Sequence, residues 1–236
     1  MDSVKTDTGR NLELAAVPVW DPYVRVFHWL LVIGMGLAWW TGTEGWMDLH
    51  YQIGLAVLGL VIFRLLWGLF GSPTARFEHF LKGPGAVLGY LRTFPARKPS
   101  HSFGHNPGGG LMVAVLLLVI LVQDASGLFN SDDILFEGPF YARVPDAVSR
   151  LMGFVHAQFF NLVLVLVGLH VAVIALYLIW KRENLVRAMV TGRAMLPAGT
   201  ADAARENGET RFASPFRALL CAVVAAAVPL AIYGLN

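Results

Sequence analysis

Apolar residues run along this chain in five long blocks that are separated by shorter polar segments. A helix needs about 20 mainly apolar residues to cross a bilayer, and each block approaches or exceeds that length. The blocks lie at about residues 22–41, 50–70, 108–129, 152–180 and 216–234. The pattern therefore predicts five transmembrane helices.

Composition leads to the same class of protein. The chain has 236 residues, of which 56% are hydrophobic and 14% charged, a balance typical of a polytopic membrane protein. Cys221 is the single cysteine, so the chain has no internal disulfide framework and no C-x-x-C-H motif for covalent haem attachment. We expect an all-α integral membrane protein.

Local signals predict where two of the helices begin and how the chain is oriented. Asp21-Pro22 and Asn106-Pro107 each place an N-cap residue before a proline at the first helical position. Lys and Arg concentrate in the N-terminal arm (three), between the second and third blocks (five) and over 181–217 (seven). Basic residues in short loops stay cytoplasmic. The N-terminus is therefore predicted to be cytoplasmic and the C-terminus periplasmic.

Four histidines fall inside the apolar blocks, namely His28, His50, His156 and His170. Ionisable groups inside a bilayer are costly and mark functional sites by default. A single buried histidine is more often a hydrogen-bonded packing residue than a ligand, but four of them in three helices favour ligation.

The predicted orientation assigns a depth to each of these histidines. His50 and His156 lie toward the periplasmic side, and His28 and His170 lie toward the cytoplasmic side. Fourteen residues of helix separate His156 from His170, which is about 21 Å along the axis and returns to nearly the same face. Depth therefore pairs His50 with His156 and His28 with His170.

Each pair offers two imidazoles from facing helices without a nearby carboxylate or cysteine, which argues against zinc and against a non-haem di-iron centre. Two imidazoles on opposite sides of an iron porphyrin fit this donor set. Small residues are then expected beside the macrocycle, although glycine is also common at membrane helix contacts. Suitable positions are Gly54, one turn after His50, and Gly34, Gly36 and Gly168.

Haem propionates need cationic partners. Arg25, one turn before His28, and Arg64, inside the second block, are candidates at the cytoplasmic-side haem. Arg25 can equally be a topological anchor, whereas the depth of Arg64 favours binding. Arg143 and Arg150 are the cations nearest the periplasmic-side pair, where snorkelling explains them equally well.

Several motifs together resemble the bacterial cytochrome b561 family, which includes the cytochrome b subunits of nickel-iron hydrogenases. They are RVFHW, LHYQIG, RLLWGLFGSPTARFEHF, GHNPGGGLM, DDILFEGP and the stretch from His156 to His170. The resemblance covers about residues 18–195 and implies a four-helix bundle with two haem b groups, ligated by histidines at the four matching positions. We accordingly expect a di-haem cytochrome b domain over 1–195, followed over 196–236 by a flexible connection and an additional transmembrane helix.

The resemblance also implies electron transfer across the bacterial inner membrane, between the quinone pool and a periplasmic redox partner such as a cytochrome c or a hydrogenase-like subunit. Bis-histidine iron has no open coordination position, which favours outer-sphere electron transfer. Candidates for partner docking are Asp132, Asp133 and Glu137, which can also form an ordinary acidic loop. Candidates beside quinone are Gln123 and Asp124 at one side of the membrane and His101 and His105 at the other.

Two other classes of function stay open. A self-sufficient membrane oxidoreductase would use superoxide or ferric iron with quinone as the co-substrate, and would turn over without a second subunit. A haem-free transporter or structural subunit would use the histidines as a proton path and would lack a b-type absorbance signal.

Overall fold

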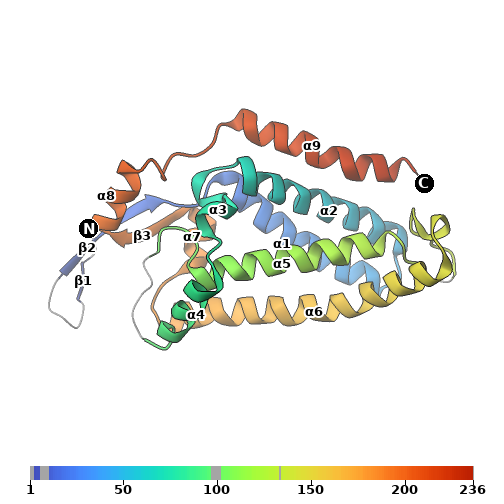
Figure 1. Ribbon diagram of the computed structural model, residues 1–236, viewed down its shortest axis with the longest axis horizontal. Coiled ribbons are helices and arrows are strands. Elements are labelled where there is room, and N and C mark those ends of the chain that lie inside the picture. Colours follow the sequence, from blue (N-terminus) through green and yellow to red (C-terminus); the bar gives the residue numbers. More distant parts are fainter. Residues whose placement is uncertain (1–2, 6–10, 97–101, 133, 236) are drawn as a thin grey trace. The chain divides into compact units, whose positions relative to one another are not determined.

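The computed structural model describes residues 3–5, 11–96, 102–132 and 134–235. Five of its helices are long and apolar enough to cross a membrane (Figure 1). They are α1 (Pro22–Thr43), α2 (Met47–Phe70), α5 (Pro107–Gly127), α6 (Asp146–Ile179) and α9 (Pro215–Tyr233). The prediction of an all-α membrane protein with five spans is confirmed.

The predicted caps start two of these helices. Asp21 Oδ1 accepts a hydrogen bond from the backbone N–H of Val24 at 2.8 Å, and Asn106 Oδ1 accepts one from Gly109 at 2.8 Å. Helix α6 starts at Asp146, earlier than the expected residue 152. Hydropathy marks only the lipid-facing part of a helix. Backbone hydrogen bonds extend α6 toward the N-terminus, into the polar segment that precedes the apolar block.

Shorter elements connect the long helices. The segment after α2 holds a 3-10 turn, η1 (Pro73–Ala75), and two helices, α3 (Phe77–Phe80) and α4 (Pro84–Thr93). Helix α4 begins at Pro84, directly after its N-cap residue Gly83. A second 3-10 turn, η2 (Tyr141–Arg143), precedes α6, and α7 (Leu185–Thr191) and α8 (Ala198–Glu206) follow it.

A three-stranded antiparallel sheet was not expected from the sequence. It has the order β1-β2-β3 and consists of Ser3–Lys5, Asn11–Pro18 and Arg193–Pro197. The register of β2 and β3 pairs Leu14 with Pro197 and Pro18 with Arg193. A flexible connection was expected to begin at residue 196, and the end of β3 and the whole of α8, which lie beyond that residue, differ from that expectation. Pairing with a strand so distant in sequence leaves no local signal.

The chain divides into two compact units. Unit 1 comprises Met1–Arg25, Trp67–Val113 and His170–Arg217, and unit 2 comprises Val26–Leu66, Ala114–Leu169 and Ala218–Asn236. The core of unit 2 joins side chains from α1, α2, α5 and α6, so these four helices form one bundle there. This core contains Val57, Val61, Val119, Ile120 and Val163, with Leu31, Met35 and others packed against it.

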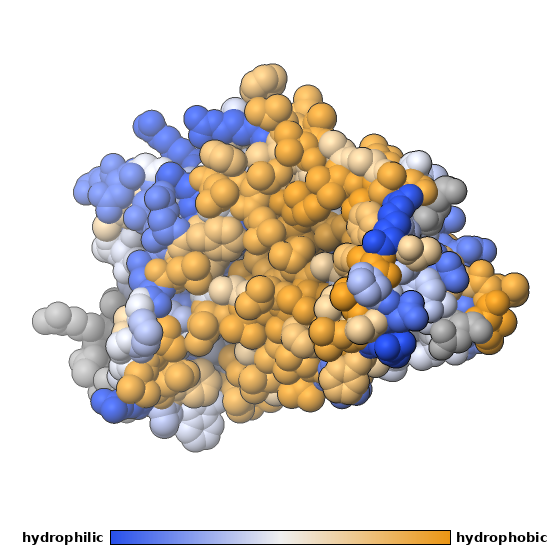
Figure 2. Space-filling view, turned by 45° about the vertical axis from the view of Figure 1, so that its right-hand side comes forward, coloured by the Kyte–Doolittle hydropathy of each residue, from blue (hydrophilic) through white to orange (hydrophobic). Residues whose placement is uncertain are grey.

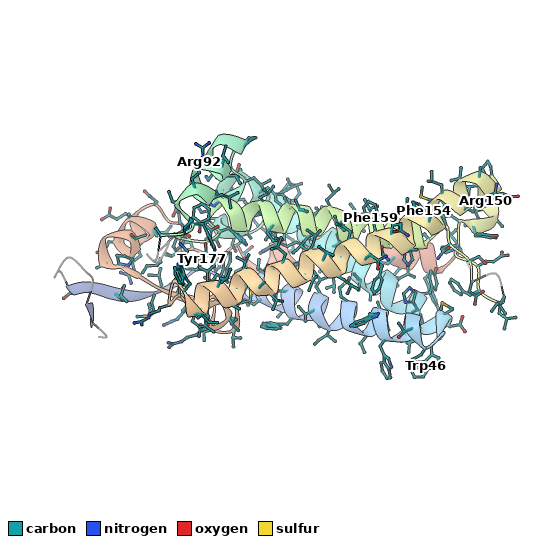
Figure 3. The ribbon with its side chains drawn as sticks, turned by 90° about the horizontal axis from the view of Figure 1, so that it is seen from below. Trp46, Arg92, Arg150, Phe154, Phe159 and Tyr177 are labelled. Atoms are coloured by element: carbon teal, nitrogen blue, oxygen red, sulfur yellow. The ribbon has the colours of Figure 1, made fainter. Side chains whose placement is uncertain are left out.

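Apolar side chains also cover the outside of the long helices. Only 11% of the most apolar stretch of α6 is buried. On this helix Phe159 packs against the core of unit 2, whereas Phe154 is exposed (Figure 3). A broad area of hydrophobic side chains is visible in Figure 2. Soluble proteins rarely expose apolar surface on this scale, which agrees with a multi-pass membrane protein embedded in lipid.

Candidate metal centre

His50, in the first turn of α2, and His156, on α6, face each other within unit 2. Their ring centroids are 6.1 Å apart and the ring planes are nearly perpendicular, at 89°. Metal–imidazole bonds are about 2 Å long, as measured for zinc, so two such bonds on opposite sides of one metal span about 4 Å. The distance from each coordinating nitrogen to the centroid of its own ring accounts for the rest of the 6.1 Å. The spacing therefore suits two axial ligands of a single metal.

Backbone carbonyls fix which nitrogen of each ring is available. His50 Nδ1 donates a hydrogen bond to the carbonyl oxygen of Ala38 at 2.9 Å, and His156 Nδ1 donates one to that of Gln123 at 2.9 Å. A carbonyl oxygen only accepts, so Nδ1 carries the proton in both rings and Nε2 keeps its lone pair. Metal-binding histidines in proteins are generally held in this way.

Two glycines lie against the ligand rings. A Cβ atom at Gly42 would be 3.1 Å from His50 Nδ1, and one at Gly127 would be 2.9 Å from His156 Cε1. Both positions therefore admit the imidazole closely because they lack a side chain. Neither glycine could be identified from the sequence, since glycines near helix ends are common and nothing in their spacing points to a histidine on another helix.

Gln123 belongs to this histidine pair. Its side-chain Nε2 donates to His156 Nε2 at 3.3 Å, in addition to the bond accepted by its main-chain oxygen, so this amide would have to turn away for His156 Nε2 to bind a metal. The residue is buried. A quinone contact for Gln123 stays a prediction, and the structure places its amide against the ring of His156. Its neighbour Asp124 is partly buried on the same helix.

The other two candidate ligands lie in different units. His28, on α1, belongs to unit 2, and its ring is perpendicular to that of Trp29 with centroids 5.0 Å apart. His170, on α6, is the first residue of the last segment of unit 1. Both side chains are half-buried. Their pairing stays a prediction.

Three further residues were expected beside haem. Arg64, on α2, is only 2% exposed and is thus a deeply buried cation in an apolar helix. Arg25 donates through Nη2 to the carbonyl oxygen of Val190 at 2.5 Å, at the last turn of α7, which gives the guanidinium a structural contact. A Cβ atom at Gly54 would meet no atom within 4 Å. Open space at Gly54 and burial of Arg64 are compatible with the expected roles, which stay predictions.

The remaining candidates lie in the connecting segments and at the start of α6. Arg143 donates to the carbonyl oxygen of Leu235 at 3.3 Å and lies over the Phe140 ring, and Arg150 is exposed on α6 (Figure 3). His105 lies between the rings of Trp20 and Phe80. Asp133 and His101 fall outside the described residues.

The donor set suits a macrocycle-bound iron. Two neutral imidazoles would hold an iron whose remaining ligands are the nitrogens of a porphyrin. Across the described ranges, no group of three or more His, Cys, Asp or Glu side chains is arranged to hold a metal ion. His50 and His156, with protonated Nδ1 and closely apposed glycines, fit haem ligation.

The fold and this site define a helical membrane protein that presents paired imidazoles inside its bundle. The family model of prokaryotic cytochrome b561 matches residues 19–192, and the chain belongs to that family. Members of the family are membrane b-type cytochromes that bind haem b and transfer electrons, and the family is quinone-linked. Among curated proteins and among solved structures, no match was found.

Proposed function

We propose that this protein is a di-haem cytochrome b of the bacterial inner membrane, which transfers electrons between the quinone pool and a periplasmic redox partner. The observation that carries the proposal is the His50–His156 pair, with ring centroids 6.1 Å apart and each Nδ1 bonded to a backbone carbonyl. Haem bound there supplies reversible one-electron chemistry at iron. The chain's own residues orient the ligand rings and exclude water.

A second haem is proposed between His28 and His170. The support is the spacing of the ligands on α6, because fourteen residues separate His156 from His170 and return to nearly the same helix face. The separation of about 21 Å along a helix covers much of a bilayer core about 30 Å thick. Arg25, Arg64 and Gly54 are proposed as haem-binding residues, with Arg64 the better supported cation because it is buried.

The proposed orientation is N-terminus in the cytoplasm and C-terminus in the periplasm. It rests on the bias of Lys and Arg toward the N-terminal arm and toward the segments that follow α2 and α6. In this orientation the His50–His156 pair lies toward the periplasm, together with the connection between α5 and α6.

That connection contains a turn suited to docking a partner. Asp132 Oδ1 accepts hydrogen bonds from the backbone N–H groups of Ile134, Leu135 and Phe136, at 2.9, 2.9 and 2.8 Å. The bonded turn presents two aliphatic side chains to solvent, since Ile134 is 81% and Leu135 94% exposed. An exposed apolar tip beside Asp132 and Glu137 supports contact with a basic redox protein.

The experiment is a redox titration of the purified protein, followed by visible spectroscopy and haem quantification. We expect two b-type components and two haems per chain. Replacing His28 or His170 by Ala should remove one and the same component, whereas His156→Ala should remove the other. His79→Ala, in the short helix α3, is the matched control and should retain both haems.

Two results would contradict the proposal. A wild-type protein without a reduced-minus-oxidised b-type signal would exclude haem-based electron transfer. Loss of the same spectral component from His28→Ala and from His156→Ala would leave the function intact and disprove the pairing.

A further inference from the structure

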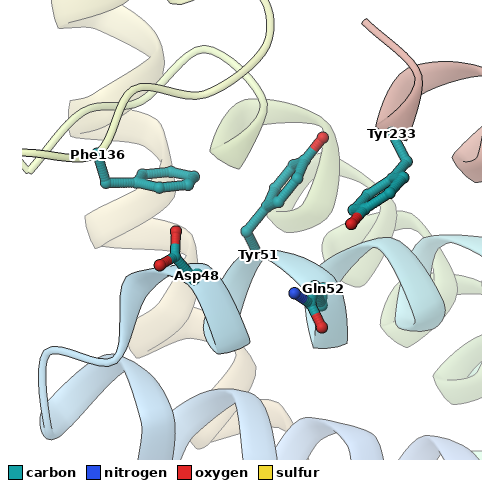
Figure 4. A pocket seen from close by; sticks show the side chains of 5 residues that line it. All are labelled: Asp48, Tyr51, Gln52, Phe136 and Tyr233. Carbon is teal, nitrogen blue, oxygen red and sulfur yellow. The ribbon is translucent and has the colours of Figure 1, made fainter. Parts of the chain in front are cut away.

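A pocket of about 370 Å³ lies in unit 2, at the end of α2 that carries His50. Five side chains line it (Figure 4), namely Asp48, Tyr51 and Gln52 of α2, Phe136 of the α5–α6 connection and Tyr233 of α9. Binding sites for small organic molecules typically have volumes of about 300–1,000 Å³. The pocket is thus large enough for a single substituted ring.

The lining combines aromatic faces with polar groups. The rings of Tyr51 and Phe136 have centroids 5.6 Å apart and are tilted by 51°. The Tyr51 hydroxyl is buried and has no hydrogen-bond partner among the described residues. Figure 4 shows the Tyr233 ring beside Tyr51, with its hydroxyl on the side of Gln52. A buried hydroxyl without a partner is costly, so a ligand oxygen that accepts its proton would be stabilising.

Tyr233 reaches this pocket from a helix outside the family match, which ends at residue 192. Two contacts tie α9 and the residues after it to the rest of unit 2. A Cβ atom at Gly59 of α2 would lie 3.3 Å from Cγ of Pro229, and Arg143 donates to the carbonyl oxygen of Leu235 at 3.3 Å. The fifth span therefore approaches α2 closely at Gly59 and brings a phenol to the mouth of the pocket.

The charge of the lining narrows the class of ligand. Among its five residues is one carboxylate, Asp48, and no cation. A small anion such as superoxide would be repelled, and ferric iron would have one carboxylate where hard cations prefer several oxygen ligands. A neutral planar molecule with an oxygen at each end fits better, because ring faces can stack on the aromatic side chains and the oxygens can bond to phenol and amide groups.

We propose that this pocket binds the head group of a quinone or quinol and that Tyr233 of α9 is one of its binding residues. The inference rests on the proposed function, since the pocket adjoins His50 through the sequence neighbours Asp48 and Tyr51. It assigns the fifth span a role, which is to complete a ligand site that the four-helix bundle leaves open on one side. Tyr51 and Tyr233 donate to the ring oxygens, and Phe136 covers a face of the ring.

The test is photolabelling of the purified full-length protein in lipid nanodiscs with an azido derivative of decylubiquinone, followed by peptide mass spectrometry. Competition with decylubiquinone then gives the affinity. We expect label on the peptides that contain Phe136 or Tyr233. Tyr51→Phe and Tyr233→Phe should each weaken binding by about threefold to tenfold, the usual effect of one lost hydrogen bond.

Tyr141→Phe is the matched control, because Tyr141 lies in η2 outside the lining and should bind the probe like the wild type. Labelling confined to other peptides, or equal affinity in all four proteins, would overturn the inference. Haem spectra of the same samples separate the two proposals. A b-type signal without labelling at this pocket contradicts the inference alone, and the absence of that signal contradicts the proposed function.

Discussion

Two half-buried histidines in this protein have opposite surroundings. His156, in unit 2, donates through Nδ1 to a backbone carbonyl and faces a second imidazole at 6.1 Å. His105, in unit 1, lies between Trp20 and Phe80, with ring centroids 4.6 Å from each. Burial is therefore a poor guide to ligation. Two other features distinguish a candidate ligand from a packing residue. Its Nδ1 donates to a backbone carbonyl, and a second imidazole faces it at a distance that admits a metal.

The largest expected effect is a loss of haem on replacement of His156 by Ala, which is compared with the same replacement of His105. His156→Ala should remove the haem proposed between this residue and His50, because one of its two proposed ligands is lost. His105→Ala should leave the haem spectrum unchanged and lower stability by about 1–3 kcal/mol, through lost contacts with two aromatic rings. Haem-to-protein ratio and thermal unfolding measure the two effects. If His105→Ala lost haem selectively, the distinction drawn between the two sites would be wrong.

A smaller effect is expected from filling the space beside a ligand ring. Gly127→Ala places a methyl group 2.9 Å from His156 Cε1, so the imidazole must shift. Overpacking of this kind typically costs about 1–3 kcal/mol. We expect weaker haem retention and altered electron paramagnetic resonance g values, which report axial-ligand orientation.

Gly89→Ala in α4 is the control for that substitution, since a Cβ atom there would also meet nothing within 4 Å and Gly89 is not expected beside haem. It should retain both the haem content and the g values of the wild type. Equal changes in Gly89→Ala and Gly127→Ala would show that helix propensity, and not contact with the ring, controls the site.

The smallest expected effect concerns pH and the turn between α5 and α6. The backbone N–H groups of Phe136, Ile134 and Leu135 hold the pKa of Asp132 below its usual value. A lowered folded pKa stabilises the turn above the ordinary value of about 3.9, and this contribution is lost as pH falls through the lowered value. Amide hydrogen exchange at Ile134 and Leu135 should therefore lose protection only below about pH 4. In Asp132→Ala, protection at these two amides should already be low at neutral pH. Equal protection in both proteins would mean that the carboxylate does not order the turn.

The five spans could be predicted from the sequence because lipid burial requires apolar side chains over a fixed length. Asp21 and Asn106 were found as caps because each precedes a proline. The sheet could not be found, since β2 pairs with a strand about 180 residues later and its alanines carry little strand signal.

The candidate site also combines features that could be predicted from the sequence with features that could not. The four histidines could be identified because ionisable side chains are rare in apolar blocks. The acceptors at Ala38 and Gln123 are backbone carbonyls, which every residue has, and Gly42 and Gly127 matter only through contacts between helices. Tyr233 could not be predicted as a site residue because its position beside Tyr51 depends on how α9 packs against α2.

The pairing of β2 with β3 has a consequence for biosynthesis. Residues 11–18 leave the ribosome early, but their partner at 193–197 follows only after α1, α2, α5 and α6 have been made. At about 5–20 residues per second, the N-terminal strand waits roughly 10–35 s for that partner. Closure of this sheet is thus a late event in translation, and it marks a nascent chain whose first four membrane helices have already been synthesised.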